Sequence, residues 1–325
     1  MPYCICVDKL VAEKIIVELR RLRLLDDEYR IMRIGNEVLV PVKIKELGEI
    51  ELSIGRMRIV ECHPPRRKKM EELKIPSLDI VGDVVIVRET VLKQMKPEEV
   101  VSAIKQIYPK VKAIWVKEET SDTYRTPVLK LLWGEEIREV IAKEYGIKLK
   151  VRLGEVYFNP RLCEEHRRLS QLVKNGEVIV DAFSGIGGFS LHIVSSKLCL
   201  VIANDVNPSA YELLLENIEL NKKKLQGTII PLNLDAKELT GVIRRKSVDR
   251  LIADLPMWSL DFVDIYEELL KPGGVLHLYK VSRINEEELR LELLDFFKTW
   301  KIQECRLVME YAPRVGIYRC DLVKP

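Results

Sequence analysis

The chain has 325 residues, of which 47% are hydrophobic and 32% charged, a composition typical of a soluble globular protein with two or three domains. No apolar run is long enough to span a bilayer, and the start lacks the basic and then apolar pattern of a signal peptide. We therefore expect a cytoplasmic protein without a membrane anchor. The net charge of +3 is too small to indicate nucleic-acid binding by itself, whereas 53 basic and 50 acidic residues beside few glutamines are typical of a hyperthermophile.

The seven cysteines are scattered along the chain, and no two of them form a CxxC pair. This pattern argues against a disulfide framework and against a zinc site. Cys4, Cys6, Cys62 and His63 could converge on a metal, but their spacing is not that of a zinc site. We therefore expect buried or half-buried thiols and no bound metal.

Residues 1–62 are predicted to form a small α+β domain. Residues 10–25 have apolar positions at helical spacing. Residues 29–34 and 37–42 alternate around Gly35-Asn36, a pair that favours a hairpin turn.

Residues 63–75 are predicted to form a basic linker, because they combine two prolines with a run of cations that includes Arg66 and Arg67. Residues 76–156 are predicted to form a second α+β domain that binds RNA. The elements expected in it are strands at 84–87 and 112–116 and helices at 97–107 and 135–145.

Residues 157–325 alternate regularly between strand-like and helical segments. The expected strands are 177–182, 199–205, 228–233, 248–253 and 274–280, and the expected helices are 188–196, 208–221, 259–271 and 284–299. Two further strand-like runs, 303–311 and 316–323, follow without a helix between them. The prediction is an α/β domain with a Rossmann-like sheet of seven strands, the last pair antiparallel.

Ligands of such sheets bind at the carboxyl ends of the strands. The first strand ends in a glycine-rich turn from Asp181 to Phe189, where Gly185 allows a ligand to approach the backbone. Residue 190 is serine rather than the third glycine of GxGxxG, which disfavours a dinucleotide site.

Acidic residues also follow the next three strands. Asp205 lies 24 residues after Asp181, a distance at which an acid can accept hydrogen bonds from ribose hydroxyls. Asn207 before Pro208 already serves as the cap of the next helix. Asp235 follows the third strand and could accept from an adenine amino group, and Asp254 follows the fourth. Four acids at one rim predict a nucleoside site.

With these motifs, the third domain resembles class I methyltransferases that bind S-adenosylmethionine. The whole chain is similar to the archaeal and eukaryotic tRNA (guanosine-37) N1-methyltransferases. The stretches that carry the resemblance are LDIVGD at 78–83, VYFNPR at 156–161, NPSAYELL at 207–214, DLP at 254–256, GGVLH at 273–277 and YAPR at 311–314. The resemblance implies S-adenosylmethionine as cofactor and tRNA as partner. In the archaeal members, a domain like the first one touches the tRNA elbow.

The resemblance also implies a role for individual residues. The cofactor contacts that it implies are His166, Asp181, Phe183, Gly185, Asp205, Val206, Asp235, Ala236 and Asp254. The tRNA contacts that it implies are Arg125, Tyr157, Arg161 and Pro256, and Arg66 and Arg67 of the basic linker are expected to lie against tRNA phosphates. We expect the protein to contact the anticodon loop and the elbow of the tRNA and to act as a monomer.

Three residues are expected to serve the chemistry, again by resemblance. Glu165 aligns with the proposed general base that removes the N1 proton, although its position four residues after Arg161 also suits an ordinary surface ion pair. Arg125 aligns with an arginine that contacts guanine O6. Asp254 stands where the family usually has asparagine, and it could accept from the exocyclic amine or help to take the proton.

Two alternatives stay open from the sequence. One is a sister enzyme of wybutosine synthesis, which transfers the aminocarboxypropyl arm of the same cofactor. The other is a tRNA-binding protein without catalysis, an alternative that is raised by Asp254. Trp258 could stack on a base or serve in the core.

Overall fold

The computed structural model describes residues 2–44, 46–52, 55–66, 78–118, 126–283, 285–312 and 314–325. Most of the predicted linker at 63–75 lies outside these residues, as do Arg67 and Arg125. The chain divides into two compact units, Met1–Pro76 with Ser102–Pro109, and Ser77–Val101 with Lys110–Pro325. No helix in the described part of the chain is long and apolar enough to cross a membrane.

The first unit contains an antiparallel sheet with the strand order β2-β3-β1-β5-β4. Its strands are β1 (Tyr3–Asp8), β2 (Met32–Ile34), β3 (Glu37–Val42), β4 (Gly48–Leu52) and β5 (Gly55–Glu61). Helix α1 (Ala12–Arg21) contributes the buried side chains of Ile15 and Leu19 to the core of this sheet. The predicted hairpin around Gly35 is confirmed by the pairing of β2 with β3.

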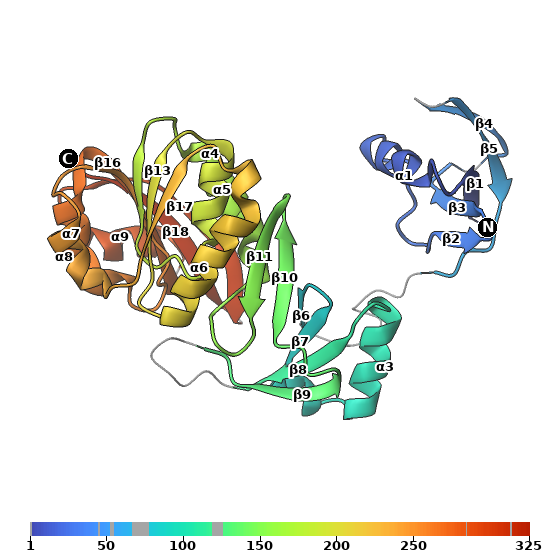
Figure 1. Cartoon of the computed structure of the whole chain (residues 1–325), viewed down its shortest axis with the longest axis horizontal. Coiled ribbons are helices and arrows are strands. Elements are labelled where there is room, and N and C mark those ends of the chain that lie inside the picture. The colour runs from blue at the N-terminus through green and yellow to red at the C-terminus, as the bar shows by residue number, and fades with distance from the viewer. Residues whose placement is uncertain are drawn as a thin grey trace. The chain divides into compact units, whose positions relative to one another are not determined.

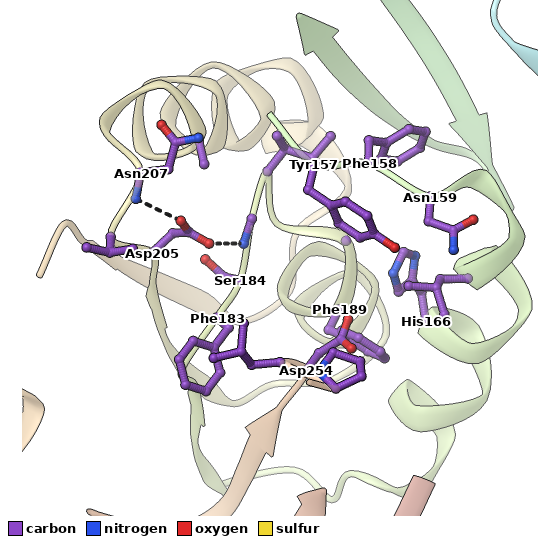
Figure 2. A pocket seen from close by; sticks show the side chains of 18 of the residues that line it. Tyr157, Phe158, Asn159, His166, Phe183, Ser184, Phe189, Asp205, Asn207 and Asp254 are labelled. Atoms are coloured by element: carbon purple, nitrogen blue, oxygen red, sulfur yellow. Dashed lines mark hydrogen bonds between the residues drawn. The ribbon is translucent and has the colours of Figure 1, made fainter. Parts of the chain in front are cut away.

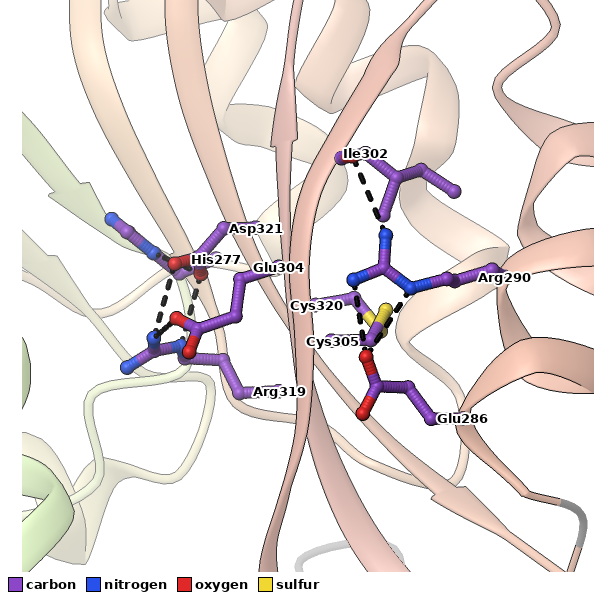
Figure 3. The surroundings of a disulfide bond; sticks show 9 residues. All are labelled: His277, Glu286, Arg290, Ile302, Glu304, Cys305, Arg319, Cys320 and Asp321. Atoms are coloured by element: carbon purple, nitrogen blue, oxygen red, sulfur yellow. Dashed lines mark hydrogen bonds and ion pairs between the residues drawn. A yellow bond between two sulfur atoms is a disulfide. The ribbon is translucent and has the colours of Figure 1, made fainter.

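Two disulfides contradict the expectation of free thiols. Cys4 in β1 is bonded to Cys62 just after β5, and Cys305 is bonded to Cys320. The second pair sits directly opposite in neighbouring antiparallel strands, with Cα atoms 4.1 Å apart (Figure 3). Because the partners are 58 and 15 residues apart with no spacing motif, only strand pairing brings the sulfur atoms together.

The second unit begins with a sheet of order β6-β7-β8-β9, in which β7 and β8 are parallel. Its strands are β6 (Leu78–Val81), β7 (Val84–Arg88), β8 (Ala113–Lys117) and β9 (Leu129–Gly134). The helices between β7 and β8 in the chain are α2 (Glu89–Leu92) and α3 (Pro97–Ile107). The predicted strands at 84–87 and 112–116 and the predicted helix at 97–107 are confirmed.

The helix predicted at 135–145 is wrong, because this segment contains β10 (Glu139–Glu144), which pairs with β11 (Ile147–Arg152). The two-residue turn between them, Tyr145-Gly146, has positive φ at both residues, the conformation of a type I′ hairpin turn. Alternate residues of β10 are buried, whereas Ile141 and Tyr145, which suited a helical stripe, are exposed.

Side chains of helix α6 (Pro208–Asn221) form hydrogen bonds with backbone groups on the edge of β11 that does not pair with β10. The amide of Asn217 pairs with both backbone groups of Lys150, and the amide of Asn221 pairs with those of Lys148, at 2.6–3.2 Å. Both asparagines are buried and lie one helical turn apart. The backbone of β11 is therefore paired on both sides at Lys148 and Lys150, which explains why a strand is stable here.

The predicted seven-stranded sheet is confirmed, with the order β14-β13-β12-β15-β16-β18-β17. Figure 1 labels β13, β16, β17 and β18 of this sheet. Its strands are β12 (Val178–Asp181), β13 (Leu200–Asn204), β14 (Thr228–Leu232), β15 (Val248–Ala253), β16 (Leu270–Ser282), β17 (Lys301–Ala312) and β18 (Val315–Val323). The first five are parallel, and β18 runs antiparallel to both β16 and β17. This is a Rossmann-like class I arrangement.

Helices cover both faces of this sheet. The helices are α4 (Cys163–Leu172), α5 (Gly188–Ser196), α6, α7 (Leu239–Val242), α8 (Val263–Leu269) and α9 (Glu286–Phe296), and the short 3-10 turns are η2 (Pro160–Leu162), η3 (Lys222–Lys224), η4 (Ala236–Glu238) and η5 (Ser259–Phe262). One core joins the strands to α7, α8 and α9, and another joins them to α4, α5 and α6. The parallel strands thus end together at one open edge.

Candidate active site

A pocket lies at the carboxyl ends of β12, β13 and β15 (Figure 2). It is lined by Tyr157, Phe158, Asn159, Leu162, His166, Phe183, Ser184, Gly185, Ile186, Gly188, Phe189, Asp205, Val206, Asn207, Ala210, Asp254, Leu255, Pro256 and Ile317. The lining therefore contains eight of the residues predicted to contact cofactor or substrate: Tyr157, His166, Phe183, Gly185, Asp205, Val206, Asp254 and Pro256.

Asp205 is fixed by the backbone. Its Oδ2 accepts a hydrogen bond from the N–H of Gly185 at 2.7 Å, and its Oδ1 accepts from the N–H of Asn207 at 2.9 Å. Burial raises the pKa of Asp205, and the two backbone donors act against that rise. The side chain of Asn207 caps α6 by accepting from the N–H of Ser209, as predicted. Asp205 is thus a preorganised acceptor at the pocket wall.

The turn between β12 and α5 brings the backbone to the pocket. Gly187 has φ of +93°, and an added Cβ there would lie 2.6 Å from Leu214, so this turn needs glycine. Asp181 is completely buried behind the turn, where its Oδ2 accepts from the hydroxyl of Ser190 at 2.7 Å. Burial raises the pKa of Asp181 to about 7, and Asp181 does not line the pocket.

The segment after β15 forms another wall, through Asp254 and the buried Pro256. Trp258 is 46% exposed, so it does not serve in the core. Phe183 packs edge-on against Phe262, with ring centroids 5.0 Å apart. Apolar side chains and fixed polar groups thus share this pocket, as is usual for small-molecule sites.

Asp235 and Ala236 lie outside the lining of the pocket. Asp235 is exposed and caps η4, where its side chain accepts from the N–H of Lys237 and Glu238 returns a bond to the Asp235 backbone. This capping role of Asp235 is structural, and it was not predicted from the sequence.

Glu165 is 2% exposed and does not line the pocket. Its Oε1 accepts from Arg319 at 2.8 Å and from the hydroxyl of Tyr279 at 3.0 Å, while its Oε2 pairs with Arg306. The alternative of a surface ion pair between Glu165 and Arg161 is therefore wrong, since Arg161 pairs with Asp79, and the nearby Arg168 pairs with Glu304.

The pairing of Glu165 belongs to a larger polar network. Arg319 also contacts Glu304 and Asp321, and Asp321 accepts from His277 at 2.7 Å (Figure 3). Burial would raise the pKa of Asp321, but His277 and Arg319 outweigh burial and lower it. Burial, together with the charge of Glu165, raises the pKa of Tyr279 well above its usual value.

A second hollow adjoins the pocket and shares Tyr157, Phe158 and Asn159 with it. Its lining contains four basic residues, Arg88, Lys93, Lys117 and Arg161, and four acidic ones, Asp79, Glu89, Glu118 and Glu310. The ammonium of Lys117 lies 6.0 Å from the ring centroid of Tyr157. Arg66, in the other unit, is exposed and lies 3.8 Å from Glu28.

A buried cluster beside the pocket was not expected from the sequence. Glu144 accepts from His166 at 2.8 Å and from His192 at 3.2 Å. Burial would raise the pKa of Glu144, but these two histidines lower it to about 2. The three residues lie on β10, α4 and α5. Because residues 135–145 were predicted to form a helix, the sequence did not indicate that Glu144 lies beside the two histidines.

Comparisons with known proteins agree with this geometry. The family model of the TRM5/TYW2 methyltransferase domain matches residues 140–307, that of the TYW2 N-terminal domain matches residues 66–148, and that of the tRNA methyltransferase 5 N-terminal domain matches residues 4–48.

Relatives of the same kind cover nearly the whole chain. The chain is 32% identical to tRNA (guanine(37)-N(1))-methyltransferase Trm5b of Pyrococcus abyssi, over 89% of each chain. It is 31% identical to Trm5b of Methanocaldococcus jannaschii, over 99% of this chain and 98% of that one. The solved complex of aTrm5 with tRNALeu matches 100% of both chains with a TM-score of 0.68 and 27% identity. The chain therefore belongs to the TRM5/TYW2 methyltransferase family.

Proposed function

We propose that this chain transfers the methyl group of S-adenosylmethionine to N1 of guanosine 37 in tRNA. The observation that carries the proposal is the pocket at the strand ends, where two backbone N–H groups hold Asp205 with its carboxylate at the wall. A carboxylate in that position suits the two ribose hydroxyls of a nucleoside. When bound, the cofactor supplies an electrophilic methyl group.

Within this proposal, Phe183, Gly185 and Val206 hold the nucleoside end of the cofactor together with Asp205. Asp181 acts indirectly, because its carboxylate holds Ser190 at the start of α5. Asp235 and Ala236 lie outside the described pocket, and their contact with adenine stays a prediction.

The second hollow is proposed to take the anticodon loop. It shares Tyr157 with the cofactor pocket, and its lining includes the cations of Arg88, Lys93 and Lys117 beside four acidic residues. Cations suit phosphates, and an aromatic ring suits an unstacked base. Arg161 belongs to the same hollow. Contact of Arg66 with the tRNA elbow, and of Arg125 with guanine O6, stays a prediction, as do the cytoplasmic location and the monomeric state.

Methyl transfer to N1 needs a group that accepts the N1 proton. We propose Glu165 for this role, as the resemblance implies, with the condition that its carboxylate first leaves Arg306. Arg306 is the partner for which this exchange is easiest, since its side chain is 22% exposed whereas that of Arg319 is buried. Asp254 and Pro256, which line the pocket, are proposed to contact the guanine base.

The test uses labelled S-adenosylmethionine and two unmodified tRNA transcripts, one with guanosine and one with adenosine at position 37. Nucleoside mass spectrometry should find N1-methylguanosine in the first and no product in the second. A product at another atom or position would contradict the proposed substrate, and no product at all would favour a binding protein without catalysis.

A second candidate is transfer of the aminocarboxypropyl arm of the same cofactor. It is favoured by the match of residues 66–148 to the TYW2 N-terminal domain. The tRNA for its test carries the tricyclic wybutosine precursor at position 37. A mass increase equal to the arm, rather than to one methyl group, would establish this candidate in place of the first.

A further inference from the structure

Glu144, His166 and His192, which we name the EHH cluster, converge inside the second unit. They come from β10, α4 and α5, and each is at most 5% exposed. Ring nitrogens of both histidines point at one carboxylate oxygen, with Nδ1 of His166 at 2.8 Å and Nε2 of His192 at 3.2 Å from Oε2 of Glu144. All three ligand-type atoms lie within 4.8 Å of one another.

Hydrogen bonding alone leaves the EHH cluster incomplete. Oε2 of Glu144 accepts two donors, whereas Oε1 is buried and has no hydrogen-bond partner among the described residues. A desolvated carboxylate oxygen without a donor is unfavourable. Its presence points to a positively charged ligand that is not a protein group.

The donor set matches a particular class of ligand. Two imidazoles and one carboxylate are the three protein ligands of many zinc sites, in which a fourth position is taken by water or by another oxygen. Ligands about 2.0–2.2 Å from a tetrahedral ion are separated by roughly 3.3 Å. The separations of 2.8 and 3.2 Å from Glu144 lie close to that value, and the two histidine nitrogens are at most 4.8 Å apart, so small side-chain movements would bring all three onto one ion.

We propose that the EHH cluster binds one Zn²⁺ ion or a similar first-row divalent ion. The ion joins the β10–β11 hairpin to the two helices that flank the cofactor pocket. It takes no part in methyl transfer, because only His166 of the three ligands lines that pocket.

The ion also orients His166. With Nδ1 on the metal, Nε2 of the same ring is left as the group that can face a ligand in the pocket. The ring is already tightly placed: it packs edge-on against Phe189 at 4.6 Å, and a Cβ on Gly188 would lie 2.5 Å from its Cε1. Loss of the ion should therefore weaken cofactor binding as a secondary effect.

The experiment uses the full chain, purified without a histidine tag. Metal content is measured by mass spectrometry of the elements, first as purified and then after removal of metal by a chelator and readdition of ZnCl₂. Titration with CoCl₂ is followed by visible absorption, which is intense only for Co²⁺ in a tetrahedral protein site. Thermal unfolding with and without ZnCl₂ gives an independent readout.

Three variants accompany the wild-type chain. His192→Gln removes a ligand that does not line the pocket, Glu144→Gln removes the anionic ligand while keeping its shape, and His63→Gln removes an exposed histidine as the matched control. Free Cys6, Cys163 and Cys199 could bind metal elsewhere, and such binding would persist in all three variants.

We expect one metal ion per chain in the wild type and in His63→Gln, and Zn²⁺ binding at least ~10-fold weaker in His192→Gln and Glu144→Gln. ZnCl₂ should raise the unfolding temperature only of chains with an intact cluster. If the wild type binds no Zn²⁺ or Co²⁺, or if both ligand variants bind as well as the wild type does, the EHH cluster is only hydrogen-bonded. Should either variant fail to fold, the stoichiometry and Co²⁺ spectrum of the wild type still decide the matter. Methyl transfer to tRNA is not used as a readout, so the outcome is independent of the proposed function.

Discussion

Asp205 and Glu165 are two carboxylates close to the same pocket, and they are held in opposite ways. Asp205 lies at the pocket wall and accepts from two backbone N–H groups. Glu165 lies behind the wall and is paired with Arg306, Arg319 and Tyr279. Backbone donors belong to a fixed turn, whereas an arginine side chain can rotate away from its partner.

This difference indicates which group is ready before substrate arrives. In the proposed role, Asp205 binds a ribose with no rearrangement, so its contribution is expected in cofactor affinity. In the proposed role of proton acceptor, Glu165 must first exchange a partner, so its contribution is expected in a later step that depends on tRNA. The predictions below separate these two contributions.

The largest effect is expected for Glu165→Gln. Because the amide cannot take the N1 proton, single-turnover methyl transfer should fall by ~10²–10⁴-fold, while the dissociation constant of the cofactor should change by less than ~3-fold. The measurement is rapid-quench single turnover at saturating enzyme and cofactor, with circular dichroism to verify folding.

Glu304→Gln is the matched control, because Glu304 shares Arg319 with Glu165 but is 44% exposed. Its turnover should stay within ~3-fold of the wild type. Equal losses in the two variants would mean that the network, rather than proton transfer, explains the effect of Glu165→Gln.

Asp205→Asn should act on affinity instead. The amide NH₂ would face one of the two backbone donors, and a charge-assisted acceptor would be lost, so the cofactor should bind ~10–100-fold more weakly. Calorimetric titration with S-adenosylmethionine measures this change. Asp264→Asn, at an exposed position of α8, should bind normally. Normal affinity in Asp205→Asn would remove Asp205 from the cofactor site.

Asp254, which lines the pocket and is proposed to contact the guanine base, allows a graded test. Asp254→Asn keeps an oxygen acceptor, so its turnover should stay within ~10-fold of the wild type, whereas Asp254→Ala should lose ~10–100-fold. Steady-state kcat and KM for tRNA measure both variants. A loss in Asp254→Asn as large as that in Glu165→Gln would transfer the role of proton acceptor to Asp254.

The smallest effect concerns pH and Asp181. Its pKa is raised by burial from 3.8 to about 7, so the folded state holds a proton that the unfolded state releases. The resulting stability is complete below about pH 4 and is lost as the pH rises to about 7. Relative to the wild type, Asp181→Asn should gain more than about 1 kcal/mol of unfolding free energy between those limits. Urea unfolding at pH 4, 6 and 8 gives the difference, and parallel curves would exclude a raised pKa.

Local patterns in the sequence were sufficient for the methyltransferase sheet. The helices predicted at 188–196 and 208–221 match α5 and α6. Their turn and cap residues lie next to them in the sequence, so local signals were enough to place them. The approach of Asp205 and Asp254 to one pocket was also predictable, because parallel strands end at the same edge. The resemblance added the family, which the comparisons confirm.

Tertiary structure alone decided the groups whose partners lie far away along the chain. Arg306 and Arg319 follow Glu165 by 141 and 154 residues, and Glu144 meets His192 across 48 residues. The formation of strand β10 and of the disulfide between Cys4 and Cys62 likewise depends on which strands pair in the folded protein. Hydrophobic periodicity indicates only which residues of one element lie on the same face. It does not indicate which side chains of other elements will pack against that face.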